Sequence, residues 1–234
     1  MRFSGMQRTS ATDYPGEVCS ILFTPGCILR CHYCYNPELV LPEKMKAAKD
    51  LMKEDDVIEK LEQRKNLVGA VTITGGEVTI HKGLTSFIRK LKDRGFKVKV
   101  DTNGTHPEML EKIIPLVDYI AMDVKATLDP EHYRKTVGVE FDVERIRKSI
   151  SMIMESGVDY EFRTTVLPSL FPLESFERLS QELAGARRYF IQQFMPGNTL
   201  NPEFSNASAY SDEELEEIKN MMEKTVREVA IRGV

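Results

Sequence analysis

Short apolar runs rich in β-branched residues alternate with amphipathic segments along most of the 234-residue chain. The runs predict six strands, each bounded by Gly, Pro, Asn or Asp. They cover Val18–Thr24, Ala70–Thr74, Phe96–Asp101, Tyr119–Val124, Tyr160–Leu167 and Arg188–Phe194. Because neighbouring parallel strands need a crossover that is usually helical, this alternation predicts an α/β fold with a mostly parallel sheet. An open doubly wound sheet and a partial (β/α) barrel both satisfy the pattern.

The segments between these strands carry helical spacing. Apolar residues within 84–91 fall at i, i+3, i+4 and i+7, and Gly95 follows as a helix terminator. Further helices are expected over Val57–Leu61, Pro107–Leu116, Val143–Ile153, Glu174–Ala184 and Ser211–Lys224. No linker or repeat interrupts the pattern. We therefore expect one domain over residues 1–234, with a core over about 13–196 and a C-terminal loop and helix over 197–234.

Composition limits the possible partners. The chain has 32 Lys and Arg against 36 Asp and Glu, a net charge of −4, which argues against a protein held to nucleic acid by a general positive field. No stretch approaches the roughly 20 consecutive apolar residues of a membrane span, and no apolar run follows the basic N-terminus. We expect a soluble cytoplasmic protein with no nucleic-acid or membrane partner.

The cysteines are confined to the first part of the chain, at Cys19, Cys27, Cys31 and Cys34. Such crowding is typical of a metal or cluster site rather than of a disulfide framework. A structural zinc site normally takes four ligands from paired motifs, and neither Cys19 nor His32 makes a good fourth ligand here. A cubane iron–sulfur cluster held by three thiolates would leave one iron open to an exogenous chelator. A zinc knuckle is the alternative, and Cys19 alone suits a small buried apolar residue.

Polar or cluster-binding groups accompany five of the six expected strands. They are Cys27 after the first, Gly75-Gly76-Glu77 after the second, Asp101 and Asn103 at the third, Asp123 and Lys125 at the fourth, and Arg163 in the fifth. In parallel α/β folds, ligands bind at the carboxyl ends of the strands. This convergence predicts an active site at that edge of the sheet.

The segment Gly26–Cys34, with Tyr33 before its last cysteine, closely resembles the cluster-binding loop of radical S-adenosylmethionine (SAM) enzymes. Gly75-Gly76-Glu77 resembles the second motif of that superfamily. The resemblance covers about residues 13–196. It implies a partial six-stranded (β/α)6 barrel and a 4Fe–4S cluster on Cys27, Cys31 and Cys34. It also implies that SAM binds the remaining iron through its amino and carboxylate groups.

Within the superfamily, the chain most resembles glycyl-radical-enzyme activases, above all those of anaerobic ribonucleotide reductase. The matching motifs are Asp13-Tyr14-Pro15-Gly16, Phe23–Cys27, Asn36–Leu39, Asp101–Gly104 and Asp123–Lys125. The resemblance implies an oxidoreductase that cleaves SAM to a 5′-deoxyadenosyl radical and installs a glycyl radical on a partner enzyme. We expect that partner to be anaerobic ribonucleotide reductase. We expect a flavodoxin- or ferredoxin-type protein as the electron donor.

The same resemblance assigns roles to individual residues. Glu77 would accept a hydrogen bond from the SAM amino group, and Gly75 and Gly76 would let the backbone approach closely. Tyr33 would pack near the adenine, with the backbone of Cys34 and Tyr35 hydrogen-bonding it. The remaining wall would be formed by Asp101, Asn103, Asp123, Lys125 and Arg163. Its carboxylates would hold polar groups of SAM or a monovalent cation, and its cations would pair with the SAM carboxylate.

Two other functions are compatible with these motifs. One is a radical SAM enzyme that acts on a small molecule, such as a deazaguanine-forming synthase. The other is a non-catalytic iron–sulfur or zinc module. The cysteine count favours a large partner over auxiliary chemistry, because after three cluster ligands only Cys19 remains and a second cluster with ordinary ligation is not available.

Overall fold

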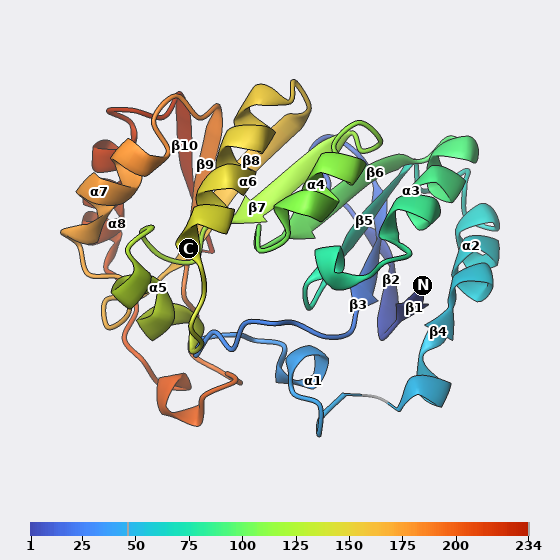
Figure 1. Cartoon of the computed structure of the whole chain (residues 1–234), viewed down its shortest axis with the longest axis horizontal. Coiled ribbons are helices and arrows are strands. Elements are labelled where there is room, and N and C mark those ends of the chain that lie inside the picture. Colours follow the sequence, from blue (N-terminus) through green and yellow to red (C-terminus); the bar gives the residue numbers. More distant parts are fainter. Residues whose placement is uncertain (46, 234) are drawn as a thin grey trace.

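A computed structural model describes residues 1–45 and 47–233 of the chain, with one eight-stranded sheet at its centre (Figure 1). The strand order across this sheet is β10-β9-β8-β7-β6-β5-β3-β2. Its strands are β2 (Gly5–Ser10), β3 (Cys19–Thr24), β5 (Ala70–Gly75), β6 (Lys97–Thr102), β7 (Tyr119–Asp123), β8 (Asp159–Val166), β9 (Arg188–Gln193) and β10 (Glu228–Arg232). A separate antiparallel pair joins β1 (Arg2–Phe3) to β4 (Met52–Lys53).

The six expected strands correspond to β3, β5, β6, β7, β8 and β9, and all of them run parallel. Their order in the sheet follows their order in the sequence, whereas a doubly wound sheet reverses its order at one point. The strand order therefore confirms the expected partial (β/α)6 barrel. Within the described residues β2 and β10 are the outer strands, so the sheet stays open between them.

The helices lie in the connections between these strands. The α-helices are α1 (Pro37–Val40), α2 (Glu54–Glu62), α3 (Leu84–Asp93), α4 (Pro107–Ile113), α5 (Pro130–Val137), α6 (Val143–Glu155), α7 (Ser175–Glu182) and α8 (Asp212–Met222). Short 3₁₀ turns lie at η1 (Ala48–Asp50), η2 (Val78–Ile80) and η3 (Pro202–Phe204). Every helix expected from the sequence is confirmed. Gly95, which follows α3, adopts a φ of 78°, the left-handed conformation typical of a helix end.

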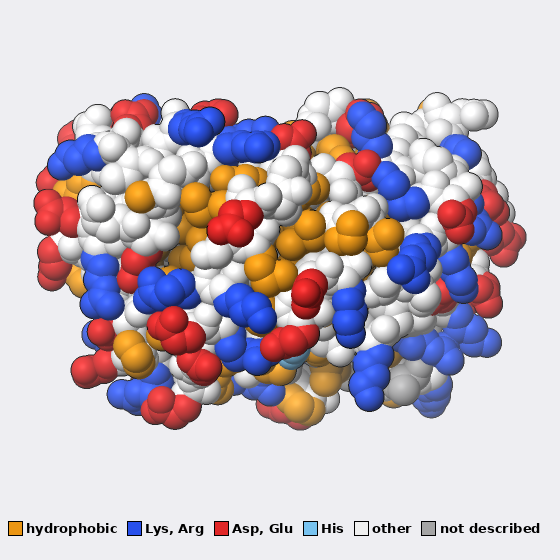
Figure 2. Space-filling model, turned by 45° about the horizontal axis from the view of Figure 1, so that its top comes forward, with side chains coloured by type: hydrophobic (Ala, Val, Ile, Leu, Met, Phe, Trp, Pro, Cys, Tyr) orange, Lys and Arg blue, Asp and Glu red, His pale blue; other side chains and the backbone are white. Residues whose placement is uncertain are grey.

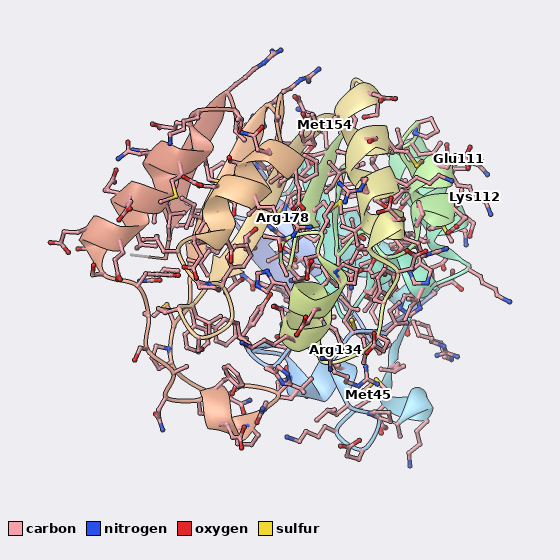
Figure 3. All side chains as sticks on the ribbon, turned by 60° about the vertical axis from the view of Figure 1, so that its left-hand side comes forward. Met45, Glu111, Lys112, Arg134, Met154 and Arg178 are labelled. Carbon is pink, nitrogen blue, oxygen red and sulfur yellow. The ribbon has the colours of Figure 1, made fainter. Side chains whose placement is uncertain are left out.

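The helices cover one face of the sheet, where the main hydrophobic core lies. Alternate strand residues such as Val100, Ile120 and Phe162 point into this core and are fully buried. Figure 3 shows α6, α7 and α8 side by side over this face, with Met154 on α6 and Arg178 on α7. Arg178 pairs with Asp129, the N-cap of α5, at 3.3 Å. We refer to this side as the outer face.

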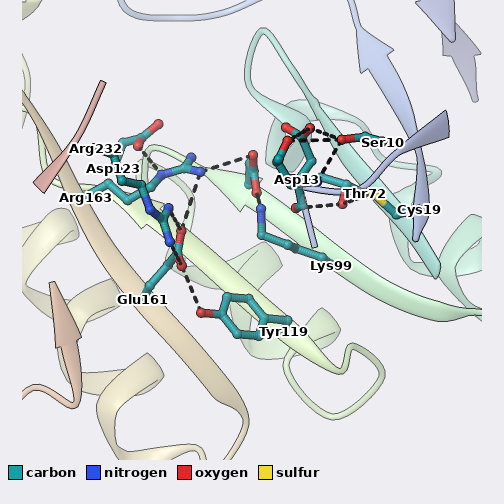
Figure 4. Close-up of polar contacts among 12 residues, drawn as sticks. Ser10, Asp13, Cys19, Thr72, Lys99, Tyr119, Asp123, Glu161, Arg163 and Arg232 are labelled. Atoms are coloured by element: carbon teal, nitrogen blue, oxygen red, sulfur yellow. Dashed lines mark hydrogen bonds and ion pairs between the residues drawn. The ribbon is translucent and has the colours of Figure 1, made fainter. Parts of the chain in front are cut away.

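The opposite, concave face carries polar and charged residues at the intervening strand positions. The loop between β2 and β3 covers part of this face. There the Tyr14 ring lies 6.0 Å from the Tyr119 ring, and the Thr72 hydroxyl donates to the Asp13 carbonyl at 3.2 Å (Figure 4). Cys19 is buried in the small apolar cluster beneath this loop, as expected.

The C-terminal segment differs from the expectation. Residues 197–234 were expected to form a loop and a helix, but α8 is followed by β10, which pairs in parallel with β9. The five residues of β10 begin and end with a charged residue and continue directly from a helical pattern, so they give no clear strand signal. Strand β2 and helix α5 were also missed, because both are short and polar.

The exterior is mixed in charge. Figure 2 shows acidic and basic side chains interspersed over one face, with hydrophobic side chains forming a band among them. None of the helices described here combines the length and the apolar character that a membrane crossing requires.

Candidate active site at the carboxyl ends of the strands

A single cavity at the carboxyl ends of β3, β5, β6 and β7 brings together every candidate site residue except Arg163. It is lined by Cys27, Cys31, Tyr33, Cys34, Tyr35, Asn36, Val40, Thr74, Gly75, Gly76, Glu77, Asp101, Thr102, Asn103, Asp123, Lys125 and Thr165. These residues come from positions up to 138 apart in the chain (165 − 27). The expected convergence of polar groups at the strand ends is therefore present in the structure.

The cysteine loop is held in place from two sides. On one side, the Arg30 amide donates to the Val137 carbonyl at the end of α5 (2.8 Å), and its guanidinium donates to the Cys27 carbonyl (2.7 Å). On the other, the Leu200 amide donates to the Cys34 carbonyl (2.8 Å). These contacts fix the loop against α5 and against the segment that follows β9.

The thiols of this loop are shielded from water. Burial raises the pKa of Cys27 to about 11 and that of Cys31 to about 12. The Asn103 side-chain amide donates to the Cys27 sulfur at 3.7 Å, so the loop after β6 contacts the cysteine loop. Burial thus favours the protonated form of both thiols, and binding a metal requires them to release their protons.

Two glycines bring the end of β5 against the start of the cysteine loop. Gly75 has a φ of 117°, and a Cβ on it would lie 2.5 Å from the Thr24 nitrogen. A Cβ on Gly76 would lie 1.9 Å from the Gly26 carbonyl oxygen. That carbonyl is itself fixed, since it accepts a hydrogen bond from the Glu77 amide at 2.7 Å. Both positions therefore require glycine for close backbone approach.

Glu77 connects the loops that follow β5 and β6. It is 1% exposed, and its carboxylate accepts from the Thr102 hydroxyl (2.6 Å), the Asn103 amide (2.7 Å) and the Thr79 amide (3.0 Å). The Thr79 hydroxyl also donates to it. Three of these donors reach Oε1, whereas Oε2 accepts only from Asn103 among the described residues. One oxygen of this carboxylate therefore retains capacity for another donor.

Asp101, Asp123 and Lys125 line the far wall of the cavity, and they belong to a chain of ion pairs that continues behind it through Arg163 and Lys99 (Figure 4). The Arg163 guanidinium donates to Asp123 at 2.8 Å and to Asp101 at 3.4 Å. Lys125 pairs with Asp123 at 3.1 Å, and Lys99 pairs with Asp101 at 2.7 Å. Burial disfavours the charged form of both carboxylates, but the attraction of the neighbouring cations is the larger effect. Arg163 and Lys125 hold the pKa of Asp123 below its usual value, and Lys99 and Arg163 do the same for Asp101.

Arg163 was expected in the wall that touches SAM, and it does not line the cavity. It lies behind Asp101 and Asp123. Among cavity residues that sequence reasoning missed, Thr102 lies within the Asp101–Gly104 motif. Thr165 is two residues beyond Arg163 on the same face of β8, where strand periodicity could have found it.

The residues present fit a 4Fe–4S cluster with SAM beside it. The donor set is three thiols on one short loop, and they line a cavity that the glycine pair also borders. The Tyr33 hydroxyl is buried at this cavity and has no hydrogen-bond partner within residues 1–45 and 47–233, which leaves a donor available to a bound group. In the same residues no three His, Cys, Asp or Glu side chains are arranged around one metal ion. A cubane takes each thiolate on a different iron, so it requires a wider arrangement.

Comparison with known proteins agrees with this geometry. Residues 21–183 match the family model of the radical SAM superfamily. The chain therefore belongs to the radical SAM superfamily. Its fold is also that of Streptococcus suis SuiB, solved bound to S-adenosylmethionine, with a TM-score of 0.67 over 91% of this chain and 52% of that one, at 17% identity.

Several of its relatives are glycyl-radical enzyme activating enzymes, and another is a 7-carboxy-7-deazaguanine synthase. The chain is 32% identical to a putative glycyl-radical enzyme activating enzyme, MJ1227, of Methanocaldococcus jannaschii, over 99% of this chain and 95% of the relative. It is 28% identical to the pyruvate formate-lyase-activating enzyme of Clostridium pasteurianum, over 85% of this chain and 83% of that protein. The chain is thus an enzyme of the radical SAM activating type, and its family membership implies a 4Fe–4S cluster and SAM.

Proposed function

We propose that this protein installs a glycyl radical on anaerobic ribonucleotide reductase, using a cluster on Cys27, Cys31 and Cys34 and SAM in the adjoining cavity. The observation that carries the proposal is that one cavity contains the three thiols, the glycine pair and the charged wall. When bound and reduced, the cluster supplies the electron that cleaves SAM into methionine and a 5′-deoxyadenosyl radical. The chain's own residues bind and orient SAM and exclude water from it.

The amino end of SAM would meet Glu77 and the two glycines. The Oε2 atom of Glu77 has room for one more donor, so it suits the SAM ammonium. Its other contacts, to Thr79, Thr102 and Asn103, would fix it in place beforehand. Gly75 and Gly76 would leave backbone rather than side chains at this end of the cavity.

The carboxylate end of SAM would meet Lys125, which lines the cavity and carries a raised pKa because Asp123 and the cysteines outweigh its burial. Arg163 would act one layer behind, by orienting Asp101 and Asp123. These two carboxylates would hold polar groups of SAM or a monovalent cation next to it. The ordinary radical chemistry of SAM needs no further group from the chain.

The adenine end would lie near Tyr33 and Tyr35. Tyr35 is fixed by the end of β9, since its hydroxyl donates to the Met195 carbonyl at 2.8 Å and its ring lies 5.7 Å from that of Phe194. The backbone of Cys34 and Tyr35 would hydrogen-bond the base. The buried hydroxyl of Tyr33 would find its partner on the bound nucleoside or cluster.

The relatives support a glycyl radical enzyme as the partner, and the choice of anaerobic ribonucleotide reductase rests on the activase motifs alone. Asp13-Tyr14-Pro15-Gly16 covers the concave face, and the Asn36–Leu39 motif borders the cavity. A flavodoxin- or ferredoxin-type donor in the cytoplasm would supply the electron.

The test uses anaerobically reconstituted protein mixed with SAM, a reductant and anaerobic ribonucleotide reductase. A doublet typical of a glycyl radical should appear in the electron paramagnetic resonance spectrum, together with one 5′-deoxyadenosine per radical. A reductase with its radical glycine replaced by alanine is the control and should give no doublet. SAM cleavage without a doublet rejects this target. A doublet on pyruvate formate-lyase alone would reassign it, and turnover of a small molecule without a partner protein would favour the synthase alternative.

A further inference from the structure

The C-terminal strand contributes a charge to the network behind the cavity. Arg232 of β10 donates to both oxygens of Glu161 on β8, at 2.8 and 3.0 Å (Figure 4). Its guanidinium also lies over the Phe190 ring of β9, 3.3 Å from the centroid. Arg232 is thus aligned by contacts with β9, the neighbour of β10, and with β8 beyond it, and its side chain is 40% exposed.

Glu161 depends on this arginine. It is 1% exposed, and it also accepts a hydrogen bond from the Tyr119 hydroxyl at 2.9 Å. Among the residues that the structure describes, its ion-pair partners are Arg232 and, at 3.8 Å, Arg163. A buried carboxylate without a close cation is strongly unfavourable, so Glu161 without Arg232 would draw Arg163 toward it.

Arg163 is therefore shared among three carboxylates. Its guanidinium contacts Asp123 at 2.8 Å and Asp101 at 3.4 Å, both in the wall of the cavity, and it is more distant from Glu161. Because Arg232 neutralises Glu161, Arg163 can stay with the two aspartates. Movement of Arg163 toward Glu161 would leave Asp101 and Asp123 poorly oriented toward the cavity.

We propose that Arg232 is a positioning residue for SAM: by neutralising Glu161, it keeps Arg163 on Asp101 and Asp123. The inference rests on the proposed function, in that it takes this cavity to bind SAM. It gives β10, which lies outside the radical SAM motifs, an indirect role in SAM binding.

The test measures SAM affinity of the reconstituted holoprotein by equilibrium dialysis, with no partner enzyme present. Arg232→Met removes the charge while its side chain still covers Phe190, and it should weaken SAM binding about tenfold. The double variant Glu161→Gln/Arg232→Met also removes the carboxylate that competes for Arg163. Its affinity for SAM should therefore return to within about threefold of the wild-type affinity. Arg232→Lys keeps the charge but loses the bidentate contact with Glu161, so its SAM affinity should lie between those of wild type and Arg232→Met.

Arg188→Met is the matched control. Arg188 is also a strand arginine of the concave face, it donates to the Tyr119 hydroxyl at 2.9 Å, and it lies over the Tyr119 ring without pairing with Glu161. Its replacement should leave SAM affinity unchanged.

Two outcomes overturn the inference. Wild-type affinity in Arg232→Met would show that the pair does not reach the SAM site. Equal impairment of the single and double variants would show that Arg232 acts only through packing or folding. If Arg232→Met does not fold, the single variant Glu161→Gln decides the question. The inference requires Glu161→Gln to bind SAM with wild-type affinity, and a loss of affinity in this variant would overturn the inference. A partner enzyme that acquires no radical rejects the proposed target without affecting these binding results.

Discussion

The two faces of the central sheet are built from the same strands and have opposite chemistry. In β8, Phe162 points to the outer face and is fully buried among apolar residues, whereas its neighbours Glu161 and Arg163 point to the concave face and form ion pairs. In β6, Val100 and Lys99 differ in the same way. Taking ions out of water costs several kcal/mol per ion unless partners compensate. The comparison indicates that the outer face supplies stability and that the concave face retains its charges for chemistry.

The largest effect that would sharpen this comparison is expected at the cavity. Cys31→Ala should lower the cluster content of reconstituted protein and reduce SAM cleavage below detection, because two thiolates from the loop cannot hold the cubane. Iron and sulfide analysis with 5′-deoxyadenosine quantification checks it. Cys19→Ala, also at a buried cysteine, should keep both the cluster and the activity. Loss of the cluster in Cys19→Ala would contradict the assignment of ligands.

The outer face should respond through stability. Phe162→Ala should lower the free energy of unfolding by about 3–5 kcal/mol, since it leaves a cavity in the core. Urea unfolding of the metal-free protein measures it, and Phe162→Leu should cost less. If the correctly folded fraction of Phe162→Ala also failed to take up iron, the two faces would not be separable in this way.

The buried charges should make stability depend on pH in a specific direction. The pKa of Asp123 is lowered in the folded protein, so this carboxylate stabilises the fold above its unfolded pKa of about 3.9, and the stabilisation is lost as pH falls below that value. The loss should be about 1–3 kcal/mol in urea unfolding between pH 6 and pH 2. Asp123→Asn should flatten this dependence. If the stability of Asp123→Asn depended on pH as steeply as that of wild type, other carboxylates would be responsible for the pH dependence.

The smallest effect is expected for an ion pair on the outside. Arg178 is 53% exposed, and its contact with Asp129 is open to solvent. Arg178→Ala should cost about 1 kcal/mol or less, and added salt should reduce the difference further. Thermal unfolding at low and high ionic strength measures both. A cost as large as that of Phe162→Ala would show that charge pairs outside the cavity also determine stability.

Much of this architecture follows from local sequence. The six parallel strands were predictable because each is apolar, short and bounded by turn residues. Most of the cavity residues were predictable because they follow those strands in compact motifs, whereas Thr165 was missed. Arg232 was not, since its importance depends on Glu161, 71 residues earlier, and a pairing of that range leaves no local pattern. Arg163 was placed on the right strand, but sequence could not show that Asp101 and Asp123 separate it from the cavity.

The close approach at Gly76 has a consequence for how this chain can vary. Any side chain there would overlap the Gly26 carbonyl oxygen, which the Glu77 amide holds in place. Every amino acid that a single nucleotide change can substitute for glycine carries a Cβ. Every missense change at position 76 therefore has to displace the backbone where the thiol-bearing loop begins.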